Sequence, residues 1–153
     1  MSQPQAKPLQ RFPVFDEEAV ERAEAALKAL SGNFQVWLED EVEKVQAARL
    51  SARAAGWTDE SIDELFAAAH DAKGLGATYD YPFVTRIAAS LCRLIETPEG
   101  KAVARAQPAL VEAHVDTIRA AVRDRIKTED HPVGRLLSAE LERRVEALGV
   151  APV

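Results

Sequence analysis

The residues in this sequence best suited to chemistry lie in the stretch LFAAAHDAKGLGATYDYP, residues 65–82. His70, Lys73 and Gly74 stand where a core helix would carry leucine and a surface helix would carry glutamate. A neutral imidazole is a good nucleophile near pH 7, since its unperturbed pKa is about 6.5. A lysine within hydrogen-bonding range balances the charge on phosphoryl oxygens as they move. This pattern suits a phosphoryl group carried on a ring nitrogen of His70.

Helical periodicity predicts where these side chains point. At 100° per residue an apolar stripe forms, consisting of Ile62, Leu65, Phe66, Ala69 and Gly76. His70 falls roughly 100° from the centre of this stripe, so we expect it at the surface. Gly74 lies one turn after His70 and Ala67 one turn before it. Ala67, Gly74 and Ala77 are the expected binding residues, because small side chains leave room for a docking protein.

The elements that must position these residues are all predicted to be helices. Apolar spacing, capping residues and prolines predict helices over about 17–30, 34–55, 59–78, 82–97, 108–126 and 133–148. The SGN sequence at 31–33 is expected to separate the first two helices, and 98–106 to form a short turn.

The expected fold is therefore all-α, an up-and-down four-helix bundle with additional terminal helices, because short connections make neighbouring helices antiparallel. Residues 1–14 contain three prolines and are expected to form a flexible arm. Residues 15–149 are expected to form one helical domain.

Composition narrows the classes of function. The chain has 153 residues and a net charge of −6, which disfavours binding to nucleic acid or to an anionic membrane surface. No apolar run approaches the roughly 18 residues of a membrane span, and no signal sequence is evident at the N-terminus. The one cysteine, Cys92, excludes an internal disulfide and a cysteine-based metal cage. We expect a cytoplasmic protein.

The pattern His70-x-x-Lys73-Gly74, on a helix of an acidic and helical chain of this size, resembles the histidine phosphotransfer (HPt) domains of bacterial multistep phosphorelays. In that family the pattern lies on a four-helix bundle. The histidine accepts a phosphoryl group from a receiver-domain aspartate and passes it to another receiver. The resemblance implies that His70 is phosphorylated, that Lys73 balances charge, and that Gly74 lets a partner approach. The next helix, with the sequence SLCRLIE, is similar to the family's partner helix.

The resemblance also implies partners and cofactors. The expected partners are receiver domains of response regulators and a sensor kinase, which can be a hybrid kinase. Mg²⁺ is expected on the receiver, and no cofactor is expected on this chain. Two positions differ from the family, which usually carries a bulky aliphatic residue before the lysine and often a glycine ten residues after the histidine. This chain has Ala72 and Asp80 there.

Two alternatives stay open. The sequence HDAK at 70–73 is also similar to the histidine box of sensor-kinase dimerisation domains, in which Asp71 would be a candidate base. That box continues with proline, where this chain has Gly74, and no glycine-rich nucleotide-binding region follows, so autonomous kinase activity is not expected. The other alternative is a non-catalytic helical adaptor that binds a partner through a groove, with His70 incidental.

The remaining reactive residue types favour structural roles. His114 shares a face with apolar residues and is expected at the edge of the core, whereas His131 precedes Pro132 and suits a turn or cap. Cys92 is expected to be a buried, inert thiol. Asp71 is expected to point to solvent. No metal site is predicted, because no two histidines have helical i, i+4 spacing.

Overall fold

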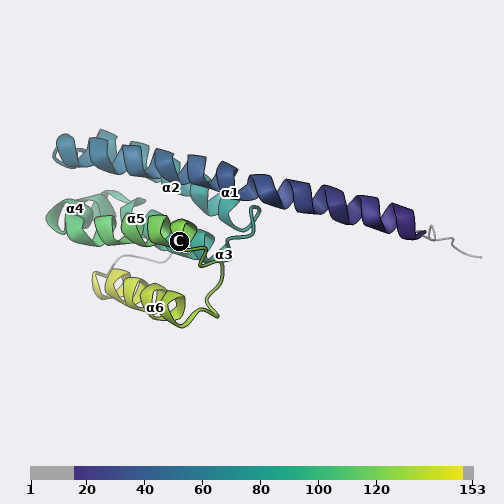
Figure 1. Ribbon diagram of the computed structural model, residues 1–153. Helices are drawn as coiled ribbons and strands as arrows, with labels where there is room; N and C mark the ends of the chain where they lie inside the picture. Colours follow the sequence, from purple (N-terminus) through teal and green to yellow (C-terminus); the bar gives the residue numbers. More distant parts are fainter. Residues whose placement is uncertain (1–15, 150–153) are drawn as a thin grey trace, which may run out of the picture. The chain divides into compact units, whose positions relative to one another are not determined.

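The computed structural model describes residues 16–149, so the predicted arm at 1–14 lies outside the described part of the chain. Within 16–149 the chain forms six helices and no strand, which confirms the all-α prediction (Figure 1). The helices are α1 (Glu17–Ala54), α2 (Asp59–Gly76), α3 (Pro82–Ile95), α4 (Pro98–Ala106), α5 (Pro108–Arg123) and α6 (Pro132–Ala147).

The prediction of a break at 31–33 is wrong, because α1 is continuous from Glu17 to Ala54. Apolar residues continue through the SGN sequence at helical spacing, from Leu27 and Leu30 to Phe34 and Trp37. An added side-chain carbon at Gly32 would have nothing within 4 Å, so the glycine serves no close contact. Local turn propensity was overridden here by the continuing helical pattern on both sides.

Internal contacts divide the chain into two units, Met1–Asn33 and Phe34–Val153, which we call the N-terminal unit and the bundle unit. The described part of the N-terminal unit is the beginning of α1. As predicted, Asp16 caps it, since its Oδ1 accepts a hydrogen bond from the Ala19 amide at 2.7 Å. Every described side chain of this unit except that of Ala19 is exposed.

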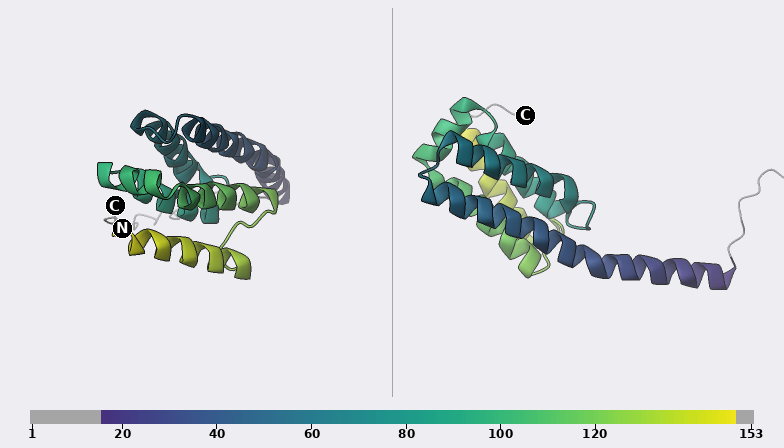
Figure 2. Two further views of the ribbon diagram at one scale, coloured as in Figure 1. Left: turned by 90° about the vertical axis from the view of Figure 1, so that its left-hand side faces the viewer. Right: turned by 90° about the horizontal axis from the view of Figure 1, so that it is seen from above.

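In the bundle unit the part of α1 after Asn33 packs along α5. The amide of Gln35 donates to the Val122 carbonyl at 3.0 Å, and further along α1 Arg49 pairs with Asp116 at 2.9 Å. Since α5 residue numbers fall as those of α1 rise, the two helices are antiparallel. Views from two further directions show these helices side by side (Figure 2). The expected up-and-down four-helix bundle is confirmed.

The chain between α3 and α5 differs from the prediction, because residues 98–106 form helix α4 and not a turn. Thr97 caps α4 with a hydrogen bond from the Gly100 amide at 3.0 Å, and Pro98 occupies the first turn, where its missing amide hydrogen has no cost. Gly100 is required there, because an added side-chain carbon would lie 2.1 Å from the Leu94 carbonyl oxygen.

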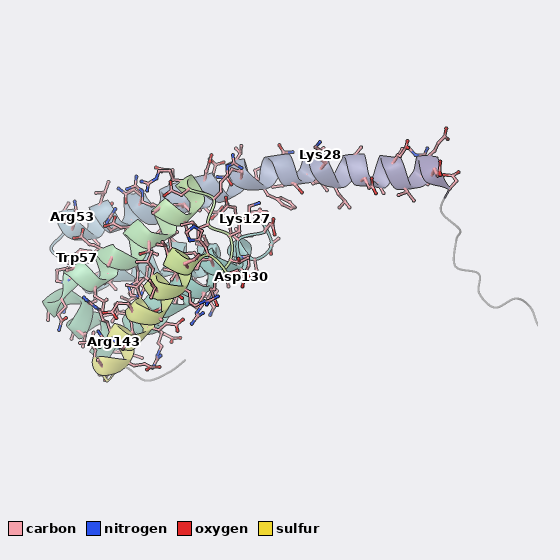
Figure 3. All side chains as sticks on the ribbon, turned by 60° about the horizontal axis from the view of Figure 1, so that its bottom comes forward. Lys28, Arg53, Trp57, Lys127, Asp130 and Arg143 are labelled. Carbon is pink, nitrogen blue, oxygen red and sulfur yellow. The ribbon has the colours of Figure 1, made fainter. Side chains whose placement is uncertain are left out.

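Helix α6 is the additional terminal helix that the sequence predicted, and it packs on α3 and α5. Arg86 of α3 donates to both carboxylate oxygens of Glu142 at 2.6 and 2.8 Å. The fully buried core of the bundle unit includes Leu38, Leu65, Ile87, Leu91 and Ile118. Trp57, which follows α1, and Lys127, which follows α5, lie toward opposite ends of the bundle unit (Figure 3).

Candidate functional site

His70 lies on the surface of α2, as the sequence predicted. Thr58 caps this helix by accepting a hydrogen bond from the Ser61 amide, and Asp59 and Glu60 lie in its first turn, where the helix dipole favours negative charge. The buried residues of α2 include Ile62, Leu65, Ala69 and Ala72, whereas His70 is exposed. The amphipathic pattern of α2 therefore turns the imidazole away from the core.

The imidazole opens onto a surface depression of about 430 Å³ between α2 and α3. The α2 side is formed by Phe66, Ala67, His70, Asp71 and Lys73, and the α3 side by Ala89, Cys92 and Glu96. The ring of Phe66 contacts the His70 ring at 5.9 Å between centroids. The depression thus brings together three predicted site residues, namely Ala67, His70 and Lys73.

Among the lysines of residues 34–149, Lys73 is the one without a carboxylate partner. In residues 34–149, Lys44 pairs with Glu41, Lys101 with Asp63 and Lys127 with Asp80, whereas Lys73 forms no ion pair. Its side chain is half-buried and lines the same depression as His70. A half-buried ammonium without a counterion is available to an incoming anion.

Gly74 is exposed and faces open space. An added side-chain carbon would have nothing within 4 Å, so no contact within the described chain requires glycine at this position. Ala77 is exposed too and lies at the C-cap of α2, one turn further along. Neither residue lines the depression, but both are on the exposed surface that follows His70 along α2.

The connection from α2 to α3 is short and tightly held. Gly76 lies against the first turn of α3, where an added side-chain carbon would be 2.6 Å from Thr85 Oγ1. Asp80, at the position where the resembled family often has glycine, adopts a positive φ of 69°. That left-handed conformation is the one glycine adopts without strain and aspartate tolerates. The Asp80 carboxylate also accepts from Lys127 Nζ at 3.2 Å.

Burial makes Cys92 a poor nucleophile at neutral pH. Burial raises the pKa of the Cys92 thiol to about 11, although the positive charge of Lys73 acts in the opposite direction. The thiol therefore stays protonated, and a protonated thiol is a poor nucleophile. This agrees with its predicted role as an inert core residue.

The other two histidines have structural partners. His114 is fully buried, with Nδ1 2.7 Å from the Leu110 carbonyl and Nε2 2.9 Å from Ser90 Oγ. Because a carbonyl only accepts, Nδ1 carries the hydrogen and Nε2 accepts from the serine hydroxyl. His131 is the N-cap of α6, as predicted, and its Nδ1 accepts from the Val133 amide at 3.2 Å.

Sequence reasoning missed the α3 side of the depression. The missed residues are Ala89, Cys92 and Glu96, which follow one another at steps of three and four residues. That spacing marks one face of a helix, so the pattern was available in the sequence. It was hidden because Ala89 and Cys92 also suit the apolar face that dominates α3.

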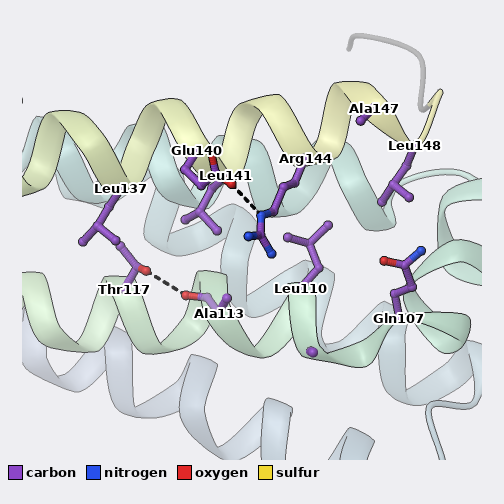
Figure 4. A pocket seen from close by; sticks show the side chains of 11 residues that line it. Gln107, Leu110, Ala113, Thr117, Leu137, Glu140, Leu141, Arg144, Ala147 and Leu148 are labelled. Carbon is purple, nitrogen blue, oxygen red and sulfur yellow. Dashed lines mark hydrogen bonds and ion pairs between the residues drawn. The ribbon is translucent and has the colours of Figure 1, made fainter.

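A second depression, of about 520 Å³, lies between α5 and α6 and contains none of the predicted site residues (Figure 4). Its walls are mainly aliphatic, with Leu110 from α5 facing Leu137 and Leu141 from α6. The ion pair between Glu140 and Arg144 lies at its edge, with Arg144 Nε 2.8 Å from Glu140 Oε1. Neither histidine nor cysteine is among the residues that line this groove.

Within residues 16–149, no group of three or more histidine, cysteine, aspartate or glutamate side chains is arranged to hold a metal ion. None of the helices described there has the length and apolar character needed to cross a bilayer. Comparisons of the chain with models of protein families, with curated proteins and with solved structures found no match.

Proposed function

We propose that this protein is a histidine-containing phosphotransfer protein, which accepts a phosphoryl group on His70 from a receiver-domain aspartate and passes it to a second receiver. The observation that carries the proposal is the pairing of an exposed imidazole with an ion-pair-free lysine at one depression. The resemblance of His70-x-x-Lys73-Gly74 to HPt domains supports the same function. So do the bundle around it and the glycine-like backbone at Asp80.

In the proposed reaction the lone pair of a His70 ring nitrogen attacks the phosphorus of the receiver's aspartyl phosphate. The N–P bond forms as the P–O bond breaks, and the receiver carboxylate leaves with the electron pair. The proton on the other ring nitrogen passes to solvent. The reverse reaction delivers the phosphoryl group to a second receiver, and no ATP is consumed by this chain.

Each neighbouring residue has a defined part in this transfer. Lys73 balances the charge on the phosphoryl oxygens, which is the main way in which proteins accelerate phosphoryl transfer. Ala67, Gly74 and Ala77 offer little bulk on the exposed side of α2, so a receiver can bring its aspartate close to the imidazole. The Mg²⁺ that supports the chemistry belongs to the receiver.

The proposal is tested with receiver domains charged with radiolabelled acetyl phosphate in the presence of Mg²⁺. The wild-type protein should acquire label that survives base and is lost in acid, as expected of a phosphohistidine, and should return it to an uncharged receiver. His70→Gln should acquire none. His131→Gln is the matched control, because His131 is also an exposed histidine but lies at the N-cap of α6, away from α2.

Two outcomes would contradict the proposal. Transfer from none of the receivers would favour the adaptor function, in which the protein binds a partner without chemistry. Equal labelling of wild type and His70→Gln would place the phosphoryl group elsewhere.

A further inference from the structure

The hydroxyl of Thr85, in the first turn of α3, is inserted into the hydrogen-bond ladder at the end of α2. Thr85 Oγ1 donates to the Lys73 carbonyl at 2.9 Å and accepts from the Ala77 amide at 2.8 Å. In a continuing α-helix the amide of residue 77 would bond directly to the carbonyl of residue 73, four residues earlier. The threonine hydroxyl therefore relays the bond that would have closed this turn of α2.

The insertion depends on a close approach of the two helices at Gly76. An added side-chain carbon there would lie 2.6 Å from Thr85 Oγ1 and 2.8 Å from Thr85 N. Both distances are below any normal contact, and one of the two atoms belongs to the backbone. Gly76 is also buried, and its carbonyl accepts from the Tyr81 amide at 2.7 Å. The connection between α2 and α3 is therefore built around this glycine and this threonine.

We infer that Thr85 is a positioning residue for phosphoryl transfer, acting through Lys73. Its hydroxyl fixes the backbone of Lys73 against α3, at the place where the lysine side chain must reach along the depression toward His70. This inference rests on the proposed function and assigns to it a residue on a different helix from the reacting histidine. Without the hydroxyl, the ammonium would be held less well in the geometry of the transition state.

The hydroxyl of Thr85 is not expected to contact the phosphoryl group itself. Its hydroxyl is committed to two partners on α2, with one bond donated and one accepted. The side chain is half-buried and does not line the depression. If removing this hydroxyl slows transfer, the effect must therefore act through α2. Lys73 is the charged residue of α2 whose backbone the hydroxyl binds.

Two substitutions separate the hydroxyl from the shape of the side chain. Thr85→Val keeps the branched shape and removes the hydroxyl, whereas Thr85→Ser keeps the hydroxyl and removes a methyl group. Thr85→Val should slow single-turnover transfer about three- to tenfold, the factor that corresponds to one ordinary hydrogen bond. Thr85→Ser should stay within about twofold of wild type on the same scale.

A matched control is available on α5, away from the site. Thr117 Oγ1 donates to the Ala113 carbonyl at 2.7 Å, a bond of the same chemical kind (Figure 4). Thr117→Val therefore removes a hydroxyl–carbonyl bond without touching α2. It should leave the transfer rate unchanged, whatever its effect on the melting temperature.

The decisive measurement combines Thr85→Val with Lys73→Ala. If the threonine acts through the lysine, the double variant should transfer no more slowly than Lys73→Ala alone. The affinity for an uncharged receiver should be the same in wild type and Thr85→Val, because positioning affects the reaction step. Circular dichroism shows whether each variant is folded, and Thr85→Ala replaces Thr85→Val if the valine variant is not.

The outcomes separate this inference from the proposed function. A wild-type protein that forms no phosphohistidine overturns the proposed function, and the positioning role falls with it. If wild type transfers normally and folded Thr85→Val transfers at the same rate, the positioning role of Thr85 is overturned and the proposed function stands. The inference would also be overturned if the fold-losses in transfer rate of Thr85→Val and Lys73→Ala multiplied in the double variant, because Thr85 would then act independently of Lys73. If Thr85→Ser transferred as slowly as Thr85→Val, the loss would come from packing of the methyl group, and the role of the hydroxyl would be overturned.

Discussion

His70 and Lys73 are neighbours on one turn of α2. Unlike the other histidines and lysines of residues 34–149, neither side chain forms a hydrogen bond or an ion pair within the described chain. His114 and His131 each hold backbone groups, and Lys44, Lys101 and Lys127 are paired with carboxylates. Side chains that the fold does not use are the ones available to a partner.

Removing the Lys73 ammonium should slow transfer and leave the fold intact. A charge-assisted hydrogen bond is worth about 1.5–3 kcal/mol, so Lys73→Ala should lose about ten- to hundredfold in single-turnover rate. Lys73→Arg should recover part of the rate, because it restores charge without the compact ammonium geometry. Melting temperatures and receiver affinity should change little. Unchanged transfer in Lys73→Ala would remove the lysine from the mechanism, and equal losses of transfer and affinity would make it a docking residue.

The buried His114 should make the protein less stable in mild acid. Burial lowers the pKa of His114 to about 4 from its ordinary value of 6.5, although its bond to Leu110 acts in the opposite direction. Above pH 6.5 the histidine is neutral in both folded and unfolded chains. As the pH falls from 6.5 to 4 the unfolded chain binds the proton first, so unfolding becomes easier by about 3 kcal/mol.

This effect is measured as the urea unfolding free energy at several pH values between 7 and 4. His114→Gln removes the titrating group, so its stability should fall less over this range than that of wild type. Parallel curves for wild type and His114→Gln would show that protonation of His114 is not coupled to unfolding.

At the residue scale the sequence predicted much of the α2 side of the site, but not which residues of α3 line the depression. The exposure of His70 followed from its angle to the apolar stripe, a local property of one helix. The absence of an ion pair at Lys73 and the relay through Thr85 depend on how two helices meet. Such contacts between separate elements are not encoded in the spacing of either helix alone.

At the element scale α2 contains two glycines with opposite environments, and they should respond oppositely to substitution. Gly74 faces open space, so Gly74→Ala should stabilise the protein by up to about 1 kcal/mol through helix propensity. Gly76 lies against Thr85, so Gly76→Ala should destabilise it by about 1–3 kcal/mol through overpacking. Urea unfolding measures both changes.

The functional consequence of bulk at Gly74 is measured separately. Gly74→Gln should fold normally and lose phosphotransfer, because a long side chain would occupy the surface that a receiver approaches. Transfer at the parental rate in Gly74→Gln would show that this surface is not used. Stabilisation by Gly76→Ala would contradict the close packing of α2 on α3.

The helix boundaries show which local signals were reliable. Caps and prolines were correct at Thr58, Pro82 and Pro108, where they agree with the apolar pattern that follows. The glycine-containing SGN sequence was misleading, because apolar spacing runs through it. Residues 98–106 were misread as a turn, although Thr97 and Pro98 are helix-start signals, because the segment is short and weakly apolar.

At the scale of the whole molecule, the bundle unit should function without the N-terminal unit. Described side chains of residues 16–33 are exposed apart from that of Ala19, so this segment contributes no residue to the core. A variant lacking residues 1–33 should keep its unfolding free energy to within about 0.5 kcal/mol. It should also keep its phosphotransfer rate. A large loss of either would show that the N-terminal unit is needed for folding or for docking.

The account as a whole depends on one chemical event at one atom, the formation of an N–P bond on the imidazole of His70. The most direct measurement is mass spectrometry at neutral pH after incubation with a charged receiver domain, with fragmentation to locate the phosphoryl group. The account predicts one phosphoryl group per chain, located on His70, which disappears when an uncharged receiver is added. A chain without phosphohistidine, or with the group on His131, would contradict it.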